Sequence, residues 1–454
     1  MRPWSRFKPW VMRWARCKWT VGLDEAVEEA LRSGPQLIKA VEESRVPDVG
    51  VAMSGGVDSA MSALLLKRAG CKVTCYYMKN WDPLDEAGGS ACNSDDSLQM
   101  VRKVCEQLQL PLREFDFIKE YWNDVFVTFL EEYQAGFTPN PDLLCNRHIK
   151  FDALLQLVRK KAGHDVLATG HYARVSYEGS KRAVRLMKGT DAAKDQTYFL
   201  ANVSQAALQH VAFPIGGLCK SQVRELASEE QLPNASRRSS TGICFIGKRP
   251  FASFLAEYIT LKDGLFVDVD SFLCGERPAR QIGRHNGMQL YTLGQRARIG
   301  GQSEAWYVAG KDRVKGDVYV AKGWGHRAHF TLSACVNDFF WVAGQPPATL
   351  ISGNTLQLSC KARYNEDPSP CCVHFGLDGV EPSSLFPMPE SLSVPPHQLH
   401  IHFHNPLRAV TPRQALVLYD GDVCLGGGPI QHAGPTLAEL AVGTSLSLTE
   451  SACL

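Results

Sequence analysis

Residues 52–59 constrain the fold of this chain more than any other segment. They read Ala-Met-Ser-Gly-Gly-Val-Asp-Ser and separate an apolar strand pattern at 48–53 from a helical pattern at 60–69. A Ser/Gly-rich turn between a strand and a helix presents backbone N–H groups and the positive end of the helix dipole to an anion. Gly55 and Gly56 allow the backbone to approach a ligand closely. The segment therefore predicts a loop that binds phosphates.

The loop lacks the lysine of a Walker A loop, which has the pattern G-x-x-x-x-G-K-[ST]. Its S-G-G-x-D-S form is similar to the pyrophosphatase-type loop (PP-loop) of enzymes that split ATP into AMP and pyrophosphate. The resemblance implies that the chain adenylates a substrate and does not transfer a γ-phosphate. The loop alone does not identify the acceptor of the adenylate.

Strand and helix patterns alternate from residue 48 to about residue 170. Strands are expected at 71–78, 112–117 and 165–169, and helices at 97–108, with Ser94 or Asp95 as N-cap, and at 151–161. Such alternation predicts a parallel sheet whose ligands bind at the carboxyl ends of the strands. The 52–59 loop and residues 169–172 both follow strands, so we expect them to meet in one crevice.

The pattern changes after about residue 250. Residues 264–325 are rich in glycine, and strand patterns at 355–364, 372–375, 399–403 and 415–419 predict a small antiparallel barrel or sandwich. We expect an α/β chain with a PP-loop parallel-sheet domain, a small central β-rich domain and a C-terminal antiparallel β-barrel. The expected parts are an N-terminal extension at 1–46, the ATP-binding domain at 47–249, the central domain at 250–325, the barrel at 326–435 and a tail at 436–454.

Three segments are expected to lie outside the cores. Residues 23–45 predict one or two exposed helices, interrupted by Ser33-Gly34-Pro35, in front of the first domain. Residues 376–397 contain five prolines and predict a long mobile loop. The tail after Ala433 is expected to be poorly ordered.

Composition narrows the class of protein. The chain is 44% hydrophobic and 21% charged, and no apolar run approaches the roughly 18–20 residues that span a bilayer. The net charge of +2 neither demands nor excludes a polyanionic partner. The 15 cysteines are irregularly spaced without a C-x-x-C pair, which argues against a disulfide framework or a zinc site. We expect no prosthetic group and no tightly bound metal.

The N-terminus is basic and amphipathic. No acidic residue precedes Asp24, and aromatic or apolar residues recur at steps of three and four, as on one helical face. This pattern is typical of a mitochondrial presequence, and we expect a mitochondrial (matrix) location. The low serine content and Pro9 argue against a transit helix. A basic leader without this role, or a true start at Met12, are the alternatives.

Two cysteines stand in unusual surroundings. Two prolines predict an extended turn at 138–142, with Asp142 three residues before Cys145, and a fixed turn is a good platform for a carboxylate and a thiol aimed at one point. The spacing equally fits a turn that leads into a helix with Cys145 as its first buried residue. Cys244 lies between two glycines. Its segment is flanked by basic residues, which would favour a thiolate: Arg237, Arg238, Lys248 and Arg249. On these residues alone, a core-strand cysteine is the better interpretation of Cys244.

Seven motifs stand in order along the chain: S-G-G-V-D-S, T-P-N-P-D-x-x-C-N-x-x-I-K-F, A-T-G-H-Y-A-R, K-D-Q-T-Y-F-L, G-I-C-F-I-G, Y-T-L-G-Q-R and G-D-V-C-L-G-G-G. With this set the chain resembles the tRNA-specific 2-thiouridylase family, from about residue 48 to about residue 430. Residues 78–82, 119–126 and 314–320 are more similar to the animal mitochondrial branch than to the bacterial one. The resemblance implies an ATP-dependent sulfurtransferase that converts the wobble uridine, position 34 of the tRNA, to 2-thiouridine.

The resemblance also implies a mechanism. Uridine O2 would attack the α-phosphorus of ATP. Asp58 would act through Mg²⁺, which binds carboxylate and phosphate oxygens. Cys244 would carry a persulfide, Cys145 would act as the nucleophile, and a transient Cys145–Cys244 disulfide would need a reductant. Asp142 would assist by proton transfer or by contact with the base, which must be flipped out. The residues implied for ATP are Ala52, Met53, Ser54, Gly55, Gly56, Val57, Asp58, Ser59, Met78 and Gly170, and those around the base are Asn140, Pro141 and Asp142.

The implied partners are tRNA for Lys, Glu and Gln, a protein that donates persulfide sulfur, and a reductant. The implied tRNA contacts are His171, Lys194, Asp195, Gln196, Arg363, Tyr364 and Gln414. The family has Pro-Gly-Gln where this chain has Pro412-Arg413-Gln414, which leaves the geometry of Gln414 open. Two other functions are considered, a PP-loop ligase of the argininosuccinate- or guanylate-synthetase type and a tRNA-binding protein without activity. Paired cysteines argue against the first, and the intact motifs argue against the second.

Overall fold

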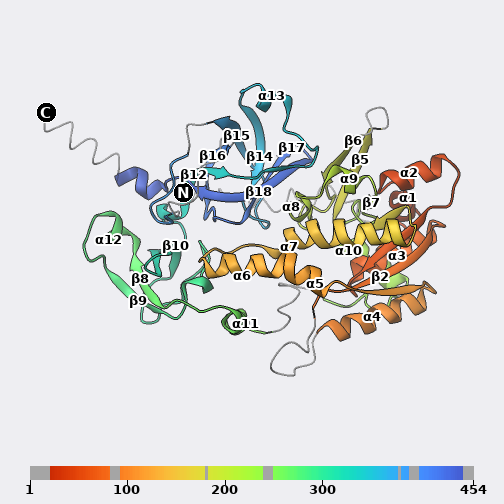
Figure 1. Cartoon of the computed structure of the whole chain (residues 1–454), viewed down its shortest axis with the longest axis horizontal. Coiled ribbons are helices and arrows are strands. Elements are labelled where there is room, and N and C mark those ends of the chain that lie inside the picture. Colours follow the sequence, from red (N-terminus) through yellow and green to blue (C-terminus); the bar gives the residue numbers. More distant parts are fainter. Residues whose placement is uncertain are drawn as a thin grey trace, which may run out of the picture.

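The computed structural model describes residues 21–81, 93–178, 183–238, 249–376, 380–387 and 398–442. Three sheets organise this part of the chain (Figure 1). In that view the parallel sheet lies at the right, the middle β domain at the left and the barrel strands at the top, with helix α6 between them. Among the described helices, none is long and apolar enough to cross a membrane.

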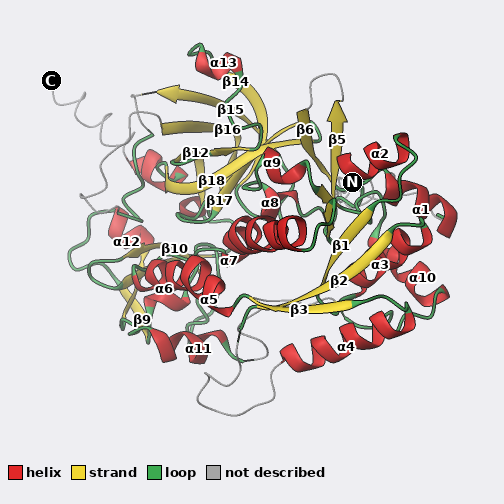
Figure 2. Cartoon of the chain, turned by 45° about the vertical axis from the view of Figure 1, so that its right-hand side comes forward, coloured by secondary structure: helices red, strands yellow, loops and turns green. Residues whose placement is uncertain are grey.

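The first sheet has the strand order β3-β2-β1-β4-β7, and every pairing in it is parallel. Its strands are β1 (Asp48–Met53), β2 (Lys72–Lys79), β3 (Leu112–Asp116), β4 (Val166–Ala168) and β7 (Val211–Ala212). Helices α3 (Val57–Arg68), α4 (Asn93–Gln107) and α10 (Lys220–Glu229) pack on it. Figure 2 shows α3, α4 and α10 beside β1–β3. The predicted parallel α/β sheet is therefore confirmed.

The two helices before β1 are not an exposed extension. In α1 (Leu23–Leu31) and α2 (Pro35–Glu42), Ala26, Ala30, Leu37 and Ala40 are fully buried. The expectation is wrong because alanines let the helix backbones approach closely, so that α1 packs against α3. The expected N-cap of α4 is also wrong, since that helix begins at Asn93 and already includes Ser94 and Asp95.

A helical arm joins the parallel sheet to the other domains. It comprises α5 (Ile118–Tyr121), the π-type turn η3 (Trp122–Phe126) and α6 (Val127–Gln134). A second helix begins with α7 (Pro141–Leu144) and continues through π-type turns in η4 (Cys145–Leu154) and η5 (Leu157–Lys161). The predicted helix at 151–161 therefore begins earlier, at Pro141. The arm packs through a large aromatic cluster against α11 (Phe251–Tyr258).

The middle domain is a four-stranded sheet of order β10-β11-β8-β9. Its elements are β8 (Gly264–Asp268), α12 (Val269–Leu273), β9 (Gln281–His285), β10 (Trp306–Asp312) and β11 (Asp317–Lys322). Phe266, Val308, Val318 and Val320 form the centre of its core.

The C-terminal domain is an antiparallel barrel. Strand β12 pairs with both β16 and β18, so the sheet closes on itself. Its elements are β12 (Phe330–Val336), β13 (Phe340–Trp341), α13 (Ala348–Ile351), β14 (Leu356–Lys361), β15 (Ser369–Gly376), β16 (Gln398–Arg408), β17 (Ala415–Asp420) and β18 (Val423–Ala433). The sequence did not predict that the hairpin β5 (Ala173–Glu178) and β6 (Ala183–Lys188) would pair with β18. This hairpin ties the parallel-sheet domain to the barrel.

Two other expectations are corrected where the structure describes the chain. In the proline-rich segment, residues 380–387 pack against the middle domain, where Leu385 is 1% exposed and its carbonyl accepts the Lys311 N–H (N–O 2.8 Å). The tail also continues past Ala433, because Glu439 accepts hydrogen bonds from both Ser383 and Ser384. Residues 377–379, 388–397 and 443–454 lie outside the described residues.

Candidate functional site

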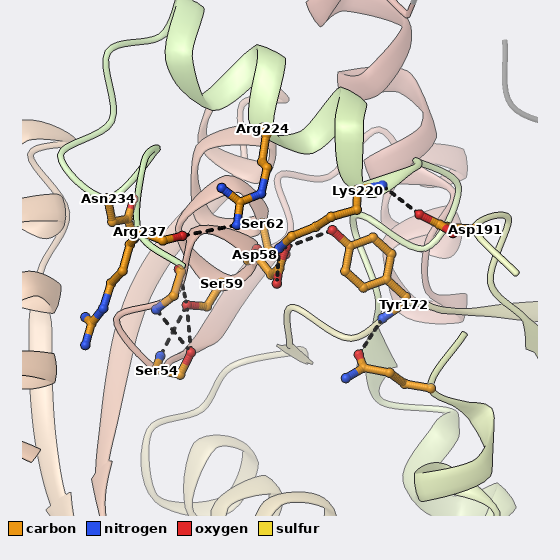
Figure 3. Close-up of polar contacts among 12 residues, drawn as sticks. Ser54, Asp58, Ser59, Ser62, Tyr172, Asp191, Lys220, Arg224, Asn234 and Arg237 are labelled. Carbon is orange, nitrogen blue, oxygen red and sulfur yellow. Dashed lines mark hydrogen bonds and ion pairs between the residues drawn. The ribbon is translucent and has the colours of Figure 1, made fainter. Parts of the chain in front are cut away.

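The phosphate-binding loop follows β1 and leads into α3. Gly55 adopts φ +78, a left-handed conformation that favours glycine, and a Cβ there would lie 2.8 Å from the Ser97 carbonyl oxygen. The Ser59 hydroxyl accepts from the Ser54 N–H (3.2 Å) and donates to the Gly56 carbonyl (3.1 Å), as Figure 3 shows for the serine pair. These bonds fold the loop over the first turn of α3. The helix N-terminus is therefore presented to the crevice.

Asp58 is held between a cation and a phenol. The Lys220 ammonium lies 2.6 and 2.7 Å from the two carboxylate oxygens, and the Tyr172 hydroxyl donates to Oδ1 at 2.8 Å (Figure 3). Burial first, and then the Asp58 charge, raise the pKa of Tyr172 far above its ordinary value, so the phenol remains a donor. The backbone N–H of Lys220 donates to Asp191 (2.9 Å). This network fixes the carboxylate at the start of α3.

A second group of contacts fixes the Gly55 carbonyl. It accepts from the buried Asn234 amide (3.1 Å) and from the Arg237 guanidinium (3.2 Å), which also donates to the Ser97 hydroxyl (3.1 Å). Arg224 in turn donates to the Arg237 carbonyl (3.2 Å). These groups bring a cation to the loop. The sequence singled out Arg237 only as a neighbour of Cys244, and no motif pointed to Asn234 or Lys220.

Gly170 brings the end of β4 against the loop. A Cβ at Gly170 would lie 2.6 Å from the Ser59 nitrogen, so only glycine allows this approach. The predicted meeting of the two segments is therefore confirmed. The next residue, His171, points inward, with its Nδ1 2.8 Å from the Thr169 hydroxyl and its ring beside Phe151 and Phe213.

Asp142 and Cys145 lie in one helix and not in an extended turn. Asn140 caps the helix by accepting the Asp142 N–H (3.0 Å), and Pro141 occupies its first position, where proline is favoured. Residues three apart share a helical face, so the carboxylate and the thiol lie on the same side. Cys145 is 4% exposed. Both interpretations of the spacing therefore hold in part: the carboxylate and the thiol lie on one side of the helix, and the cysteine is buried.

Lys150 lies on the same helix as Cys145. Its ammonium donates to Asn146 Oδ1 (2.9 Å). Burial raises the pKa of the Asp142 carboxyl, and the Lys150 charge opposes that rise. Burial also lowers the pKa of His171 well below its ordinary value, and Lys150 lowers it further. The contact between this helix and the segment that packs on the loop is made by the next residue, since the centroid of the Phe151 ring lies 5.7 Å from that of the His171 ring.

The K-D-Q segment, residues 194–196, has one exposed residue and two residues whose side chains form hydrogen bonds within the protein. Lys194 is exposed. Asp195 is 3% exposed and accepts from the Gly189 N–H (3.0 Å) and the Thr197 hydroxyl (2.8 Å). Gln196 accepts the Tyr172 N–H (3.0 Å). Asp195 and Gln196 therefore shape the turn that presents Lys194.

The barrel residues face the junction between domains. Arg363 donates to the carbonyls of Leu293 in the middle domain (2.6 Å) and Ala409 in the barrel (2.8 Å), so it connects these two domains. The Tyr364 ring lies 4.4 Å from the Phe199 ring. Gln414 Nε2 lies 3.5 Å from the Thr138 carbonyl, at the start of the T-P-N-P-D motif.

Met78 is the penultimate residue of β2, at the same edge of the sheet as the loop, and is half-buried. Cys244 lies outside the described residues.

Three family models match the chain in succession. Residues 47–248 match the tRNA methyl transferase HUP domain, residues 252–322 the tRNA methyl transferase PRC-barrel domain, and residues 387–430 the aminomethyltransferase beta-barrel domain. Mitochondrial tRNA-specific 2-thiouridylase 1 of Gallus gallus is 38% identical over 425 residues, which cover 87% of this chain and 94% of that protein. The tRNA-specific 2-thiouridylase MnmA of Protochlamydia amoebophila is 42% identical over 392 residues, which cover 86% and 94%.

The chain belongs to the tRNA-specific 2-thiouridylase family. Among solved structures, the U34-tRNA thiolase NcsA from Methanococcus maripaludis is 16% identical, with a TM-score of 0.31, over 52% of this chain and 71% of that one. The resemblance to this family leads us to expect a glycine at the position of Arg413. Arg413 adopts φ +68, the conformation that a glycine would take without strain.

Proposed function

We propose that this chain is an ATP-dependent tRNA-uridine 2-sulfurtransferase that replaces O2 of the wobble uridine with sulfur. The observation that carries the proposal is the crevice in which a PP-loop, its Asp58–Lys220 pair and the Asp142–Cys145 helix are connected through Gly170, His171 and Phe151. Membership of the family supports this assignment over a PP-loop ligase that acts on a small molecule.

ATP binds along the PP-loop in this proposal, with Met78 and Gly170 near the adenosine. The loop N–H groups and the hydroxyls of Ser54 and Ser59 hold the phosphates, while Lys220 and Arg237 supply positive charge. Asp58 offers hard carboxylate oxygens, the donor that Mg²⁺ prefers, so the residues present fit this ion together with ATP phosphates. When bound, Mg²⁺ would neutralise phosphate charge.

Adenylation makes the uridine oxygen a leaving group. Uridine O2 attacks the α-phosphorus, an O–P bond forms, and pyrophosphate leaves. Asn140, Pro141 and Asp142 border the flipped base, and the Asp142 carboxyl, whose pKa burial raises, accepts or returns a proton near it.

Sulfur then replaces the adenylated oxygen. Cys244 carries a persulfide from a donor protein, and the Cys145 thiolate attacks its inner sulfur, which gives a Cys145–Cys244 disulfide and releases hydrogen sulfide. The sulfide attacks C2, a C–S bond forms, and AMP leaves with the former uridine oxygen. In a second route, the persulfide itself attacks C2 before Cys145 resolves the link. A reductant returns both cysteines to thiols.

On the RNA side, Lys194 meets the tRNA directly, and Tyr364, Arg363, His171 and Gln414 lie along the path of the anticodon arm. Lysine fits phosphate contacts and tyrosine fits base stacking. Asp195 and Gln196 act through the turn that presents Lys194. The acceptors are tRNAs for Lys, Glu and Gln, and the protein acts in the mitochondrial matrix.

A reconstituted reaction tests the proposal. The full chain is incubated with tRNA, ATP–Mg²⁺ and a persulfide donor, and 2-thiouridine is measured by mass spectrometry. Wild type is expected to form 2-thiouridine at position 34, and Cys145→Ser and Cys244→Ser are expected to abolish it. Cys274→Ser serves as a control because this exposed thiol lies in the middle domain. Thiolation that persists in both Cys145→Ser and Cys244→Ser would overturn the roles assigned to these thiols.

A further inference from the structure

Phe137 lies where all three domains meet, just before the T-P-N-P-D motif. The Arg313 guanidinium lies 4.3 Å from the centroid of the Phe137 ring, and the Arg413 guanidinium lies 5.5 Å from it. The Phe386 ring lies 5.9 Å from the same ring. We call these four residues the Phe137 joint. They come from the ends of α6 and β10, from residues 380–387 and from the turn before β17, so the joint connects four separate segments.

The residues on either side of Phe137 also contact the other two domains, through their backbone carbonyls. The buried Lys311 ammonium donates to the Gly136 carbonyl (3.0 Å), and Gln414 Nε2 lies 3.5 Å from the Thr138 carbonyl. Three successive residues, 136–138, therefore each contact the middle domain or the barrel. They lead directly to Asn140, the cap of the helix that carries Asp142 and Cys145.

Arg413 belongs to the joint although its backbone adopts a left-handed conformation (φ +68). A left-handed conformation is sterically unfavourable for a residue other than glycine. The side chain gains a contact with the Phe137 ring, and its Nε lies 3.7 Å from Glu132 Oε1 at the end of α6. A glycine would remove the backbone cost and also both contacts. The chain thus has a cation at a barrel position that reaches both α6 and the segment that leads to the base-bordering residues.

We propose that Arg413 is a positioning residue, which through Phe137 and Glu132 fixes the start of the Asp142–Cys145 helix relative to the barrel. The inference rests on the proposed function, because it assigns these residues to the thiolation of tRNA. A misplacement of about 1 Å can lower a rate by about 100-fold when reacting groups must be aligned. Arg413 therefore acts on the turnover of bound tRNA and not on the binding of ATP.

Hydrogen exchange and kinetics of Arg413→Gly test this inference. We expect amide exchange in the peptide at 136–145 to rise about tenfold, kcat for thiolation to fall about tenfold, and KM for ATP to stay unchanged. Phe137→Leu keeps an apolar side chain but removes the ring, and it should raise exchange in the same peptide. Arg298→Gly is the matched control, since exposed Arg298 also has a left-handed backbone (φ +52) but lies outside the joint.

Three results would overturn the inference. They are unchanged exchange at 136–145 in Arg413→Gly, the same change in Arg298→Gly, and increased exchange throughout the parallel sheet, which would indicate general unfolding. The exchange measurement needs no activity. If wild type fails to thiolate tRNA while the local exchange behaves as expected, the proposed function fails and the positioning contact stands.

Discussion

At the residue scale, Asp58 has two partners that come from distant parts of the chain. The PP-loop motif already marked this carboxylate as functional, but it did not indicate the charge that faces it. Lys220 follows Asp58 by 162 residues, and Tyr172 follows it by 114. No local pattern around Lys220 predicts such a contact, because only the packing of α10 beside α3 creates it. The loop could therefore be predicted from the sequence, whereas the residues that pair with Asp58 could be identified only from the folded structure.

Substitution of Lys220 tests that pairing. Lys220→Met removes the positive charge beside Asp58, so we expect KM for ATP to rise at least tenfold, or about 1.4 kcal/mol, because the phosphates then meet an uncompensated carboxylate. ATP-dependent release of pyrophosphate in the presence of tRNA measures this change. Lys72→Met is the control, because Lys72 pairs with Asp48 at the opposite end of the sheet and is 72% exposed. An unchanged KM in Lys220→Met would contradict the role of the lysine.

At the element scale, the first helices show why exposure was misjudged. The sequence of α1 contains four acidic residues, Asp24, Glu25, Glu28 and Glu29, a composition typical of a solvated helix. Its alanines nevertheless form a narrow face that contacts α3. Small residues carry a weak hydrophobic signal, so periodicity alone did not reveal that face. In α7 the sequence did carry a local signal. Asn140 is a favoured N-cap residue and Pro141 is favoured at the first helical position, so together they indicate the start of a helix and not an extended turn.

Ala30→Glu tests whether α1 belongs to the core. The substitution would bury a carboxylate at a fully buried position, so we expect the free energy of unfolding in urea to fall by about 2–4 kcal/mol. Glu28→Ala, on the exposed face of the same helix, should change it by less than about 0.5 kcal/mol. Equal stability of the two variants would mean that α1 is dispensable for the fold.

The end of α6 predicts a pH dependence. Burial raises the pKa of the Glu132 carboxyl to about 7, against the opposing charge of Arg413. The folded state therefore binds this proton more tightly than the unfolded chain does. The resulting stabilisation is fully present below pH ~4.5 and is lost as the pH rises through about 7.

Glu132→Gln removes this titration. We expect the unfolding free energy of wild type, relative to that of Glu132→Gln, to fall by about 1–3 kcal/mol between pH 5 and pH 8. Denaturant titrations of both proteins at several pH values measure the difference. A constant difference across this range would show that Glu132 does not titrate there.

At the scale of the whole molecule, the order of the three β-containing parts could be predicted, but not how they join. Alternating strand and helix patterns in the first part and short strand patterns in the last indicated the architecture. The β5–β6 hairpin, the packing of residues 380–387 and the Phe137 joint all depend on contacts between segments distant in sequence. Such contacts leave no local pattern, and they are the ones that place the thiol-bearing helix beside the barrel.

The fate of the uridine oxygen tests the central claim most directly. A tRNA carrying ¹⁸O at O2 of uridine 34 is thiolated by the full chain with unlabelled ATP, and the AMP is analysed by mass spectrometry. Adenylation of O2 predicts one ¹⁸O atom in each AMP formed, in equal number to the 2-thiouridines. Thiolated tRNA accompanied by unlabelled AMP would contradict the account, because the oxygen would then have left without passing through an adenylate.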